Sequence, residues 1–213
     1  MNTDNIIVNT QSSIRINLDK IIYFDPFKIE DECHDADIIF ITHSHYDHFD
    51  IESINKIKND NTIVVCPKSM ENEINEIKFN EYHYLNPNEE TTLLGINIKT
   101  IPSYNNNKEF HPRSNNWLGY IINYNDITYY IAGDTDKTKD NEMVKCDIAL
   151  IPIGGHYTMD VNEAVELLKI IKPKIVIPTH YGSIVGSSTD GIKLQEKLKE
   201  YNIPVQDKLK FFN

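Results

Sequence analysis

The sequence predicts an α/β fold in one domain, residues 1–213, with polar site residues at the ends of strands. Three observations carry this prediction. Short apolar runs rich in β-branched residues alternate with segments of helical periodicity. A histidine-rich turn, residues 42–48, directly follows one of these runs. Two later runs are followed by Asp134 and by His180.

The first half of the chain is expected to alternate strands with helices. The strands are predicted from short apolar or alternating runs at residues 6–9, 13–17, 21–24, 36–41, 62–67 and 81–85, with two more between residues 91 and 103. The helices are predicted from apolar residues spaced three or four apart: Ile51, Ile54 and Ile57 after the capping residue Asp50, and Met70, Ile74 and Ile77 after Ser69.

The second half opens with a long polar loop. Residues 104–116 have no apolar periodicity, and loops of this length in a compact domain are usually functional or disordered. Further strands are expected at residues 118–124, 127–132, 147–153 and 175–178, the first two joined by a tight turn at residues 125–126. Helices are expected after Asp160 and near the C-terminus, where Ile192, Leu194 and Leu198 are the apolar positions.

Composition excludes several classes of function. The chain has 32 acidic and 21 basic residues, a formal net charge of −11. Arg15 and Arg113 are its only arginines. Binding to nucleic acid is therefore not expected, because phosphate recognition needs clustered Lys and Arg. No apolar stretch approaches the length of a membrane span.

Cysteine usage and the N-terminal residues favour a cytoplasmic protein. Cys33, Cys66 and Cys146 are odd in number and irregularly spaced, which is typical of reduced thiols. Residues 1–5 lack the cationic start and apolar stretch of a signal peptide. We expect a cytoplasmic protein with a small-molecule substrate, and a homo-oligomer is compatible with this composition.

The histidine-rich turn has the donor groups and the spacing of a metal site. His43 and His45 are two residues apart, so both side chains leave an extended backbone on the same side and can bind one cation. Asp47 and His48 follow and can face a second cation about 3.5–4 Å away, as in two-metal sites. The alternative is a surface turn without metal, which the preceding strand disfavours.

The order of these motifs resembles that of a known family. The pattern H-x-H-x-D-H in residues 43–48, then His111 in a loop, then Asp134 and His180 after strands, is similar to the metallo-β-lactamase fold along nearly the whole chain. Within that fold the chain most resembles hydrolases allied to L-ascorbate-6-phosphate lactonase and to the N-acyl-phosphatidylethanolamine phospholipase D branch. The resemblance implies an αββα sandwich, with two mixed sheets packed face to face and helices outside.

The resemblance also implies a dinuclear metal site. The first metal would take His43, His45 and His111, the second Asp47, His48 and His180, and Asp134 would bridge the two. Imidazole and carboxylate donors without a thiolate suit zinc first, and also manganese or iron. A true β-lactamase is disfavoured, because its bridging position commonly holds a cysteine.

Reasoning from the residues alone leaves some roles open. The third ligand of the first metal is His111 or His83, and the loop position favours His111. Asp25, which Pro26 should hold extended, is a hydrogen-bond acceptor for a ligand histidine or a turn residue. His156 follows a strand and two glycines, and is a general acid or an exposed loop residue. Three tyrosines are further candidates for the pocket: Tyr104, Tyr157 and Tyr181.

The implied function is that of a metal-dependent hydrolase. A hydroxide bridging two metals would attack a small ester, lactone, amide or phosphodiester, with Asp47 and His156 as catalytic residues. A di-iron redox protein of the same fold would need an acidic residue at a motif histidine or a flavin domain, and the sequence has neither. A nuclease of the same fold is disfavoured by the acidic charge, and a binding module without catalysis would not need seven ligands.

Overall fold

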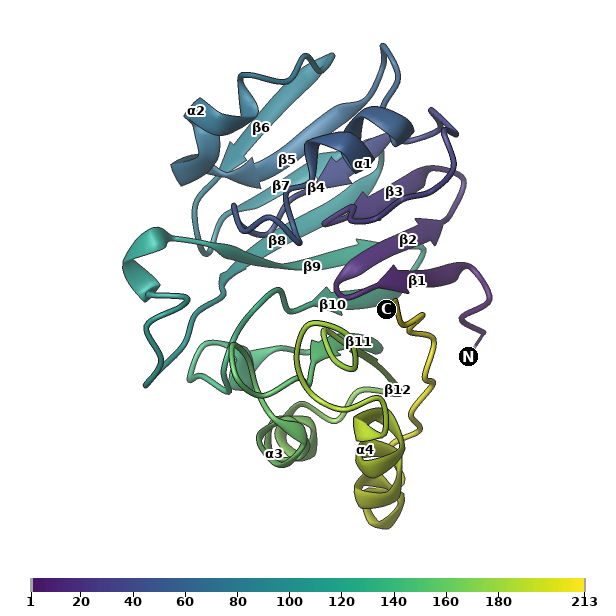
Figure 1. The fold of residues 1–213 in the computed structure, drawn as a ribbon, viewed down its shortest axis with the longest axis vertical. Coiled ribbons are helices and arrows are strands. Elements are labelled where there is room, and N and C mark those ends of the chain that lie inside the picture. Colours follow the sequence, from purple (N-terminus) through teal and green to yellow (C-terminus); the bar gives the residue numbers. More distant parts are fainter. Residues whose placement is uncertain (1, 213) are drawn as a thin grey trace.

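Two six-stranded sheets form the framework of the protein and pack face to face (Figure 1). The computed structural model describes residues 2–212. The first sheet is built from residues 6–85 and the second from residues 90–179. Helices lie on the outer sides of the two sheets (Figure 1). The αββα sandwich expected from the sequence is confirmed.

The first sheet has the strand order β1-β2-β3-β4-β5-β6. β1, β2 and β3 pair antiparallel, whereas β3, β4, β5 and β6 run parallel. The parallel strands therefore all end at the same edge of this sheet, after which Asp25 and the histidine-rich turn follow. Its strands are β1 (Ile6–Thr10), β2 (Ser13–Asn17), β3 (Ile21–Phe24), β4 (Ile38–Phe40), β5 (Ile63–Pro67) and β6 (Glu81–Leu85).

The second sheet has the order β12-β11-β10-β9-β8-β7. β10, β11 and β12 are parallel, and β8 has the same direction because β9 pairs antiparallel with both β8 and β10. These four strands therefore end at one edge. The strands are β7 (Glu90–Leu93), β8 (Ile96–Pro102), β9 (Leu118–Tyr124), β10 (Ile127–Ile131), β11 (Ile148–Pro152) and β12 (Ile175–Thr179).

Alternate residues of β4 belong to two different apolar layers. Ile38 and Phe40 belong to the layer between the sheets, where the Phe40 ring packs against Tyr120 with centroids 5.0 Å apart. Ile39 and Ile41 belong to the layer that also holds Ile54 and Ile57 of the first helix. A parallel strand covered on both faces needs apolar side chains on both. This burial fixes the strand that leads into the histidine-rich turn.

Four α-helices cover the sheets: α1 (Ile51–Ile57), α2 (Glu71–Ile74), α3 (Val161–Ile171) and α4 (Asp190–Leu198). Short 3₁₀ turns occur at η1 (Lys68–Met70), η2 (Arg113–Asn115), η3 (Asn141–Met143) and η4 (Lys199–Tyr201). Asp50 caps α1 and Asp160 caps α3 through their side chains, as expected. Within residues 2–212, no helix has the length and apolar character needed to cross a membrane.

The predicted elements occur in the predicted order, with differences in detail. The helix expected after Ser69 is a 3₁₀ turn followed by the single turn of α2. Ile51 and Ile192, expected on buried helix faces, are 45% and 56% exposed, because Ser53 and Gly191 occupy those buried positions. The β9–β10 hairpin turns at Asn125 and Asp126, both with positive φ.

Candidate metal centre

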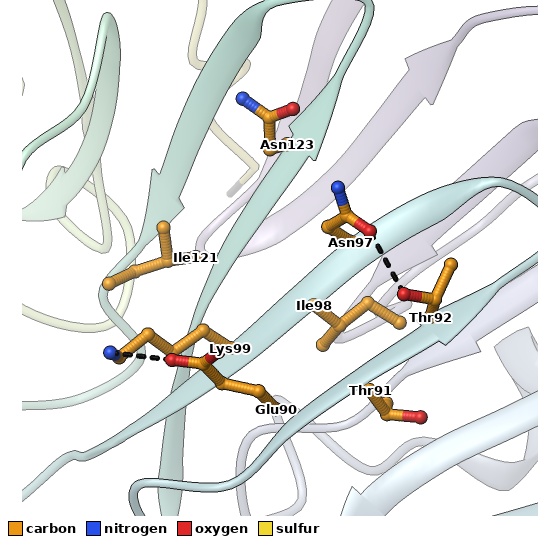
Figure 2. A pocket seen from close by; sticks show the side chains of 8 residues that line it. All are labelled: Glu90, Thr91, Thr92, Asn97, Ile98, Lys99, Ile121 and Asn123. Atoms are coloured by element: carbon orange, nitrogen blue, oxygen red, sulfur yellow. Dashed lines mark hydrogen bonds and ion pairs between the residues drawn. The ribbon is translucent and has the colours of Figure 1, made fainter.

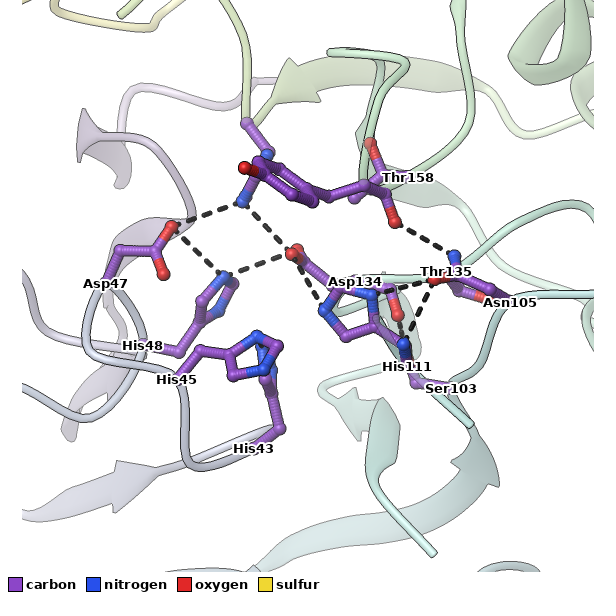
Figure 3. A network of polar contacts seen from close by, with 12 residues as sticks. His43, His45, Asp47, His48, Ser103, Asn105, His111, Asp134, Thr135 and Thr158 are labelled. Carbon is purple, nitrogen blue, oxygen red and sulfur yellow. Dashed lines mark hydrogen bonds and ion pairs between the residues drawn. The ribbon is translucent and has the colours of Figure 1, made fainter. Parts of the chain in front are cut away.

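The candidate site lies where strands of both sheets end (Figure 3). β4 leads into residues 43–48, and β8 into the long loop that carries His111. β10 is followed by Asp134 and β12 by His180. Because the ends of these strands face one another across the sandwich, residues far apart in the sequence converge at one point.

The first group of donors consists of His43, His45 and His111, called the histidine set below. One ring nitrogen of each lies within 4.8 Å of the others. His43 Nε2 and His45 Nδ1 are 3.1 Å apart. His43 and His111 are buried, and His45 is partly exposed. The structure therefore places the two histidines of the turn beside the loop histidine, as the sequence predicted.

The second group consists of Asp47, His48 and His180, called the mixed set below. Their donor atoms also lie within 4.8 Å of one another. His180 Nε2 is 3.3 Å from Asp47 Oδ2, and His48 Nε2 is 3.7 Å from the same oxygen. His180 has a φ of +55°, a conformation that costs a non-glycine residue energy and is often found at functional sites.

Asp134 lies between the two sets. Its Oδ1 is 3.3 Å from His48 Nε2, and its Oδ2 is 3.1 Å from His180 Nε2 and 3.4 Å from His111 Nε2. The preceding Gly133 has a φ of +65°, and a Cβ there would come within 3.0 Å of the Leu118 carbonyl oxygen. Glycine thus permits the close approach that brings Asp134 to the centre.

Several buried donor atoms at this point lack hydrogen-bond partners among residues 2–212. They are His48 Nε2, His111 Nε2, Asp134 Oδ1 and both ring nitrogens of His180. An unsatisfied buried polar group costs roughly 1–3 kcal/mol, so their convergence requires an occupant. Imidazole and carboxylate donors at these separations fit two divalent cations.

A buried carboxylate orients the mixed set. His48 Nδ1–H donates to Asp25 Oδ2 at 2.7 Å, which turns Nε2 toward the centre. Asp25 also accepts from the Thr42 amide at 2.7 Å and from its hydroxyl at 2.6 Å. The expectation of an extended Asp25 before Pro26 is wrong, because its φ is +45°. These hydrogen bonds hold Asp25 in that conformation and assign it the acceptor role.

Uncharged side chains orient the histidine set. Thr42 Oγ1 lies 2.9 Å from His43 Nδ1. His111 Nδ1–H donates to Asn105 Oδ1 at 3.0 Å, and the His111 amide donates to the same oxygen at 3.1 Å. Asn105 Nδ2 in turn donates to Asp136 Oδ1 and to the Tyr157 carbonyl, both at 2.9 Å. Asn105 therefore fastens the loop that carries His111 to two neighbouring loops.

Trp117, the single tryptophan of the chain, packs against the histidine set. Its ring centroid lies 4.8 Å from that of His43, 4.9 Å from that of His45 and 5.5 Å from that of His111. It is 9% exposed. The indole thus forms an apolar wall behind these three imidazoles.

Burial favours the neutral form of His43 and His45. It lowers the pKa of His43 well below the ordinary value, and the neighbouring imidazole of His48 lowers it further. The pKa of His45 is also lowered, by burial and by His111. A neutral imidazole is the form that binds a metal ion, so His43 and His45 are prepared for that role.

Carboxylates dominate the charge of the mixed set. Burial opposes the charged form of His48, but Asp134 and Asp25 outweigh it and hold its pKa well above the ordinary value. Asp134 and Asp47 likewise raise the pKa of His180 to about 9 against the effect of burial. Burial opposes ionisation of Asp134, yet His180 and His48 keep its pKa well below the usual range. Negative charge on these carboxylates is therefore what a cation would neutralise.

Other predicted residues lie elsewhere. His83 in β6 pairs with Glu81 at 2.6 Å, outside the centre. His156 is exposed, and its ring packs against those of Phe110 and Tyr157. Its role as a general acid stays a prediction. Of the three candidate tyrosines, Tyr157 lines the cavity over the centre, whereas the other two are buried and donate to carboxylates elsewhere: Tyr104 to Asp140 and Tyr181 to Asp207.

The sequence did not point to Gln11, which also reaches the centre. Gln11 lies fully buried in the turn between β1 and β2, and its Nε2 is 3.4 Å from Asp47 Oδ2. The main-chain carbonyl oxygen of Gln11 accepts a hydrogen bond from the main-chain amide of His180 at 2.9 Å. Gln11 has no neighbouring motif residue, so the local pattern carries no signal for it. The same holds for Asn105, whereas Asp136 was not predicted although it lies two residues after Asp134.

A cavity of about 300 Å³ opens over the donor atoms. It is lined by His45, Tyr46, Asp47, Phe110, His111, Asp134, Tyr157, His180 and Ile184. A second hollow of about 320 Å³ lies on β7, β8 and β9, where Glu90 pairs with Lys99 and Thr92 donates to Asn97 (Figure 2). Within residues 2–212, that hollow contains no residue of the histidine set or the mixed set, and it does not include Asp134.

Comparison with known proteins identifies the family. A model described as a β-lactamase superfamily domain matches residues 4–181. A UPF0173 metal-dependent hydrolase of Thermoplasma volcanium is 34% identical over 205 residues, which is 89% of each chain. Another, from Pyrococcus horikoshii, is 34% identical over 73% of this chain and 71% of its own. A crystal structure described as a metal-dependent hydrolase from Parabacteroides distasonis superposes with a TM-score of 0.83 and 28% identity, over 96% of this chain and 93% of that one. The chain thus belongs to the metallo-β-lactamase superfamily and, within it, to the UPF0173 metal-dependent hydrolases.

Proposed function

We propose that the protein binds two divalent metals, zinc in the first place, and hydrolyses a small ester, lactone, amide or phosphodiester. The position of Asp134 between the histidine set and the mixed set carries this proposal. A single metal at the histidine set would not need a carboxylate within 3.4 Å of donor nitrogens from both sets. The narrower likeness to the lactonase and phospholipase D branch stays a prediction.

The residues divide the work of binding and orientation. The histidine set would hold one metal and the mixed set the other, and Asp134, which lies between the sets, would be shared by the two. When bound, the metals supply Lewis acidity and lower the pKa of water at the site toward about 7. Asp25 and Asn105 keep the ring nitrogens of His48 and His111 aimed at the centre. Trp117 shields the histidine set from water on one side.

Two further residues are proposed to move protons. Asp47 lines the cavity; burial opposes its ionisation, but His48 and His180 lower its pKa to about 2, so it is proposed to act as an ionised carboxylate that takes up a proton only transiently. His156, at the rim beside Phe110 and Tyr157, is the proposed proton donor to the leaving group. His156→Ala should slow the hydrolysis of alkyl esters far more than that of nitrophenyl esters, whose leaving group needs no proton. If His156→Ala slows the hydrolysis of both ester classes equally, His156 lies at the cavity rim and does not donate a proton to the leaving group.

The metal content tests the central claim. Protein purified without chelator should contain about two divalent metals per chain by elemental analysis. Removing them with a chelator should abolish the hydrolysis of 4-nitrophenyl esters, and adding zinc should restore it as the second equivalent binds. A protein that binds one metal tightly and gains no activity from more would contradict the dinuclear assignment.

A further inference from the structure

The cavity over the metal centre has an apolar rim. Tyr46, Phe110, Tyr157 and Ile184 line it together with the donor residues. Tyr46 lies between the ligands His45 and Asp47 in the sequence, and Phe110 directly precedes His111. The loops that present the donors thus also present the rim, and any molecule that reaches the centre must pass these side chains.

The aromatic side chains of the rim pack against neighbouring rings, and two of them stay accessible to solvent. The Phe110 and Tyr157 rings meet edge to face, with centroids 4.6 Å apart. Tyr46 packs edge to face on Phe27 at 6.0 Å and is still 66% exposed, and Phe110 is 39% exposed. Exposed aromatic side chains gathered at a concave polar centre are typical of a ligand pocket.

No Lys or Arg side chain lines the cavity among residues 2–212. The basic residues of the neighbouring loop are paired elsewhere. Lys108 Nζ donates to Asp136 at 2.5 Å and to the Thr158 carbonyl at 2.6 Å, and Arg113 pairs with Asp140 at 3.1 Å. A phosphate or carboxylate placed away from the metals would meet aromatic rings and no countercharge, which is costly.

We infer that the substrate is an acyl compound, such as an ester, lactone or amide, that is uncharged outside its reacting group and carries a small apolar or aromatic arm. This rests on the proposed hydrolytic function. Water adds to the acyl carbon, the bond to the leaving oxygen or nitrogen breaks, and the leaving atom takes up the proton. A cavity of about 300 Å³ suits only a small arm. Phosphoryl substrates are disfavoured, because their extra charge is usually met by Lys or Arg.

A matched pair of esters tests the charge preference. 4-Nitrophenyl 4-methylpentanoate and 4-nitrophenyl hemisuccinate have acyl groups of nearly the same shape, and only the second is charged. The zinc-loaded protein should prefer the neutral ester by at least about 30-fold in kcat/KM. Across acetate, butyrate and hexanoate, kcat/KM should rise by up to about fourfold per methylene. A preference for the hemisuccinate or for bis(4-nitrophenyl) phosphate, or no effect of arm length, would overturn the inference.

Substitutions in the rim should redirect this preference. Ile184→Lys adds a cation and should raise kcat/KM for the hemisuccinate by about tenfold while lowering it for the neutral ester. Phe110→Ala should reduce the gain per methylene, and Phe110→Leu should restore it. Met143→Ala, which removes an exposed apolar side chain outside the cavity, is the control and should change neither ester. An unchanged ester ratio in Ile184→Lys would contradict the assigned rim.

Binding without turnover separates this inference from the proposed function. The methyl ketone 2-octanone cannot be hydrolysed, and ligand-observed NMR should show it binding at least tenfold more tightly than 2-butanone. Phe110→Ala should remove that difference. If no ester is hydrolysed but the ketones behave as stated, the hydrolytic proposal fails and the apolar site stands. If esters are hydrolysed but the ketones bind equally, the apolar site fails.

Discussion

The histidine set and the mixed set differ in charge and in how they are oriented. His43 and His111 are oriented by a hydroxyl and an amide, Thr42 and Asn105. The mixed set contains a carboxylate ligand, and the buried carboxylate of Asp25 orients His48. A set of neutral imidazoles favours borderline-soft zinc, whereas carboxylate donors also suit harder cations such as manganese. The two halves of the proposed dinuclear centre thus differ in the metals that they favour.

This difference makes the two halves separable by experiment. Each set has orienting residues of its own, Asn105 for the histidine set and Asp25 for the mixed set. Asp134 is shared. Substitution of the shared residue should affect both metals, and substitution of an orienting residue should affect mainly one.

The largest effect is expected from Asp134→Ala. Loss of the shared carboxylate removes one donor from each set and the negative charge that offsets the cations. The variant should lose most of one metal equivalent by elemental analysis and more than about 100-fold in hydrolysis, since loss of an orienting residue alone typically costs 10–100-fold. His83→Ala is the control, and it should keep both metals. Wild-type metal content and rate in Asp134→Ala would exclude the bridging role.

Asp25→Asn should weaken mainly the mixed set, with a smaller effect on the histidine set through Thr42, which donates to Asp25 and contacts His43. The amide keeps the size of the carboxylate but no longer carries the charge that fixes the His48 ring. We expect a 10–100-fold loss of affinity for one metal equivalent, measured by competition with a chromophoric chelator. Asp50→Asn, at the capping residue of α1, is the matched control. Equal weakening of both equivalents would show that the two halves are not separable.

Asn105→Ala should weaken the histidine set, and by less. It removes the acceptor of His111 Nδ1–H and the link to Asp136, but Thr42 still orients His43. About a tenfold loss of affinity for one equivalent is expected, in the same competition assay. Asn123→Ala, in β9, should leave both equivalents unchanged. If Asn105→Ala weakened only the metal equivalent that Asp25→Asn also weakens, the assignment of Asn105 to the histidine set would be contradicted.

The same contrast explains how much of the site the sequence predicted. Four candidate ligands lie within residues 43–48, so their spacing alone indicated metal chemistry. His111, Asp134 and His180 come from separate loops, and the resemblance brought them together. The strand order of each sheet and the meeting of strand ends depend on long-range pairing such as β9 with β8 and β10. No local pattern encodes that pairing.

Orienting residues were the hardest to predict. Asp25 was visible as a candidate because it ends a strand before a proline, but its positive φ was not expected. Asn105 and Gln11 act through contacts with residues 6 and 36 positions away. Asn is common in this chain, so residue type does not single out Asn105, and Gln11, one of three glutamines, lies outside any motif. Their roles follow from geometry that only the folded chain has.

The smallest functional effect is expected from Trp117→Phe, and the fluorescence of Trp117 itself can distinguish metal binding at the histidine set from binding at the mixed set. The indole packs against the histidine set at 4.8–5.5 Å, so its fluorescence should report that set. Titration of metal-free protein with Co²⁺, which quenches indole emission at short range, should show most of the quenching with one of two equivalents. In Asn105→Ala this quenching should need a higher Co²⁺ concentration than in the wild type. In Asp25→Asn the Co²⁺ concentration needed for it should change much less.

Trp117→Phe keeps an aromatic wall behind the three imidazoles while removing the reporter. It should therefore bind both metals with affinities within about threefold of wild type, and a small cost in stability of about 1–3 kcal/mol follows from the smaller ring in a packed position. Elemental analysis and thermal unfolding measure the two quantities. If both Co²⁺ equivalents quench the wild-type fluorescence equally, the indole does not report the histidine set alone. That result would contradict the division of the centre into two separately oriented halves. If Trp117→Phe loses one metal, the ring is part of what holds the histidine set together, which would place an apolar side chain alongside Thr42 and Asn105 among its supports.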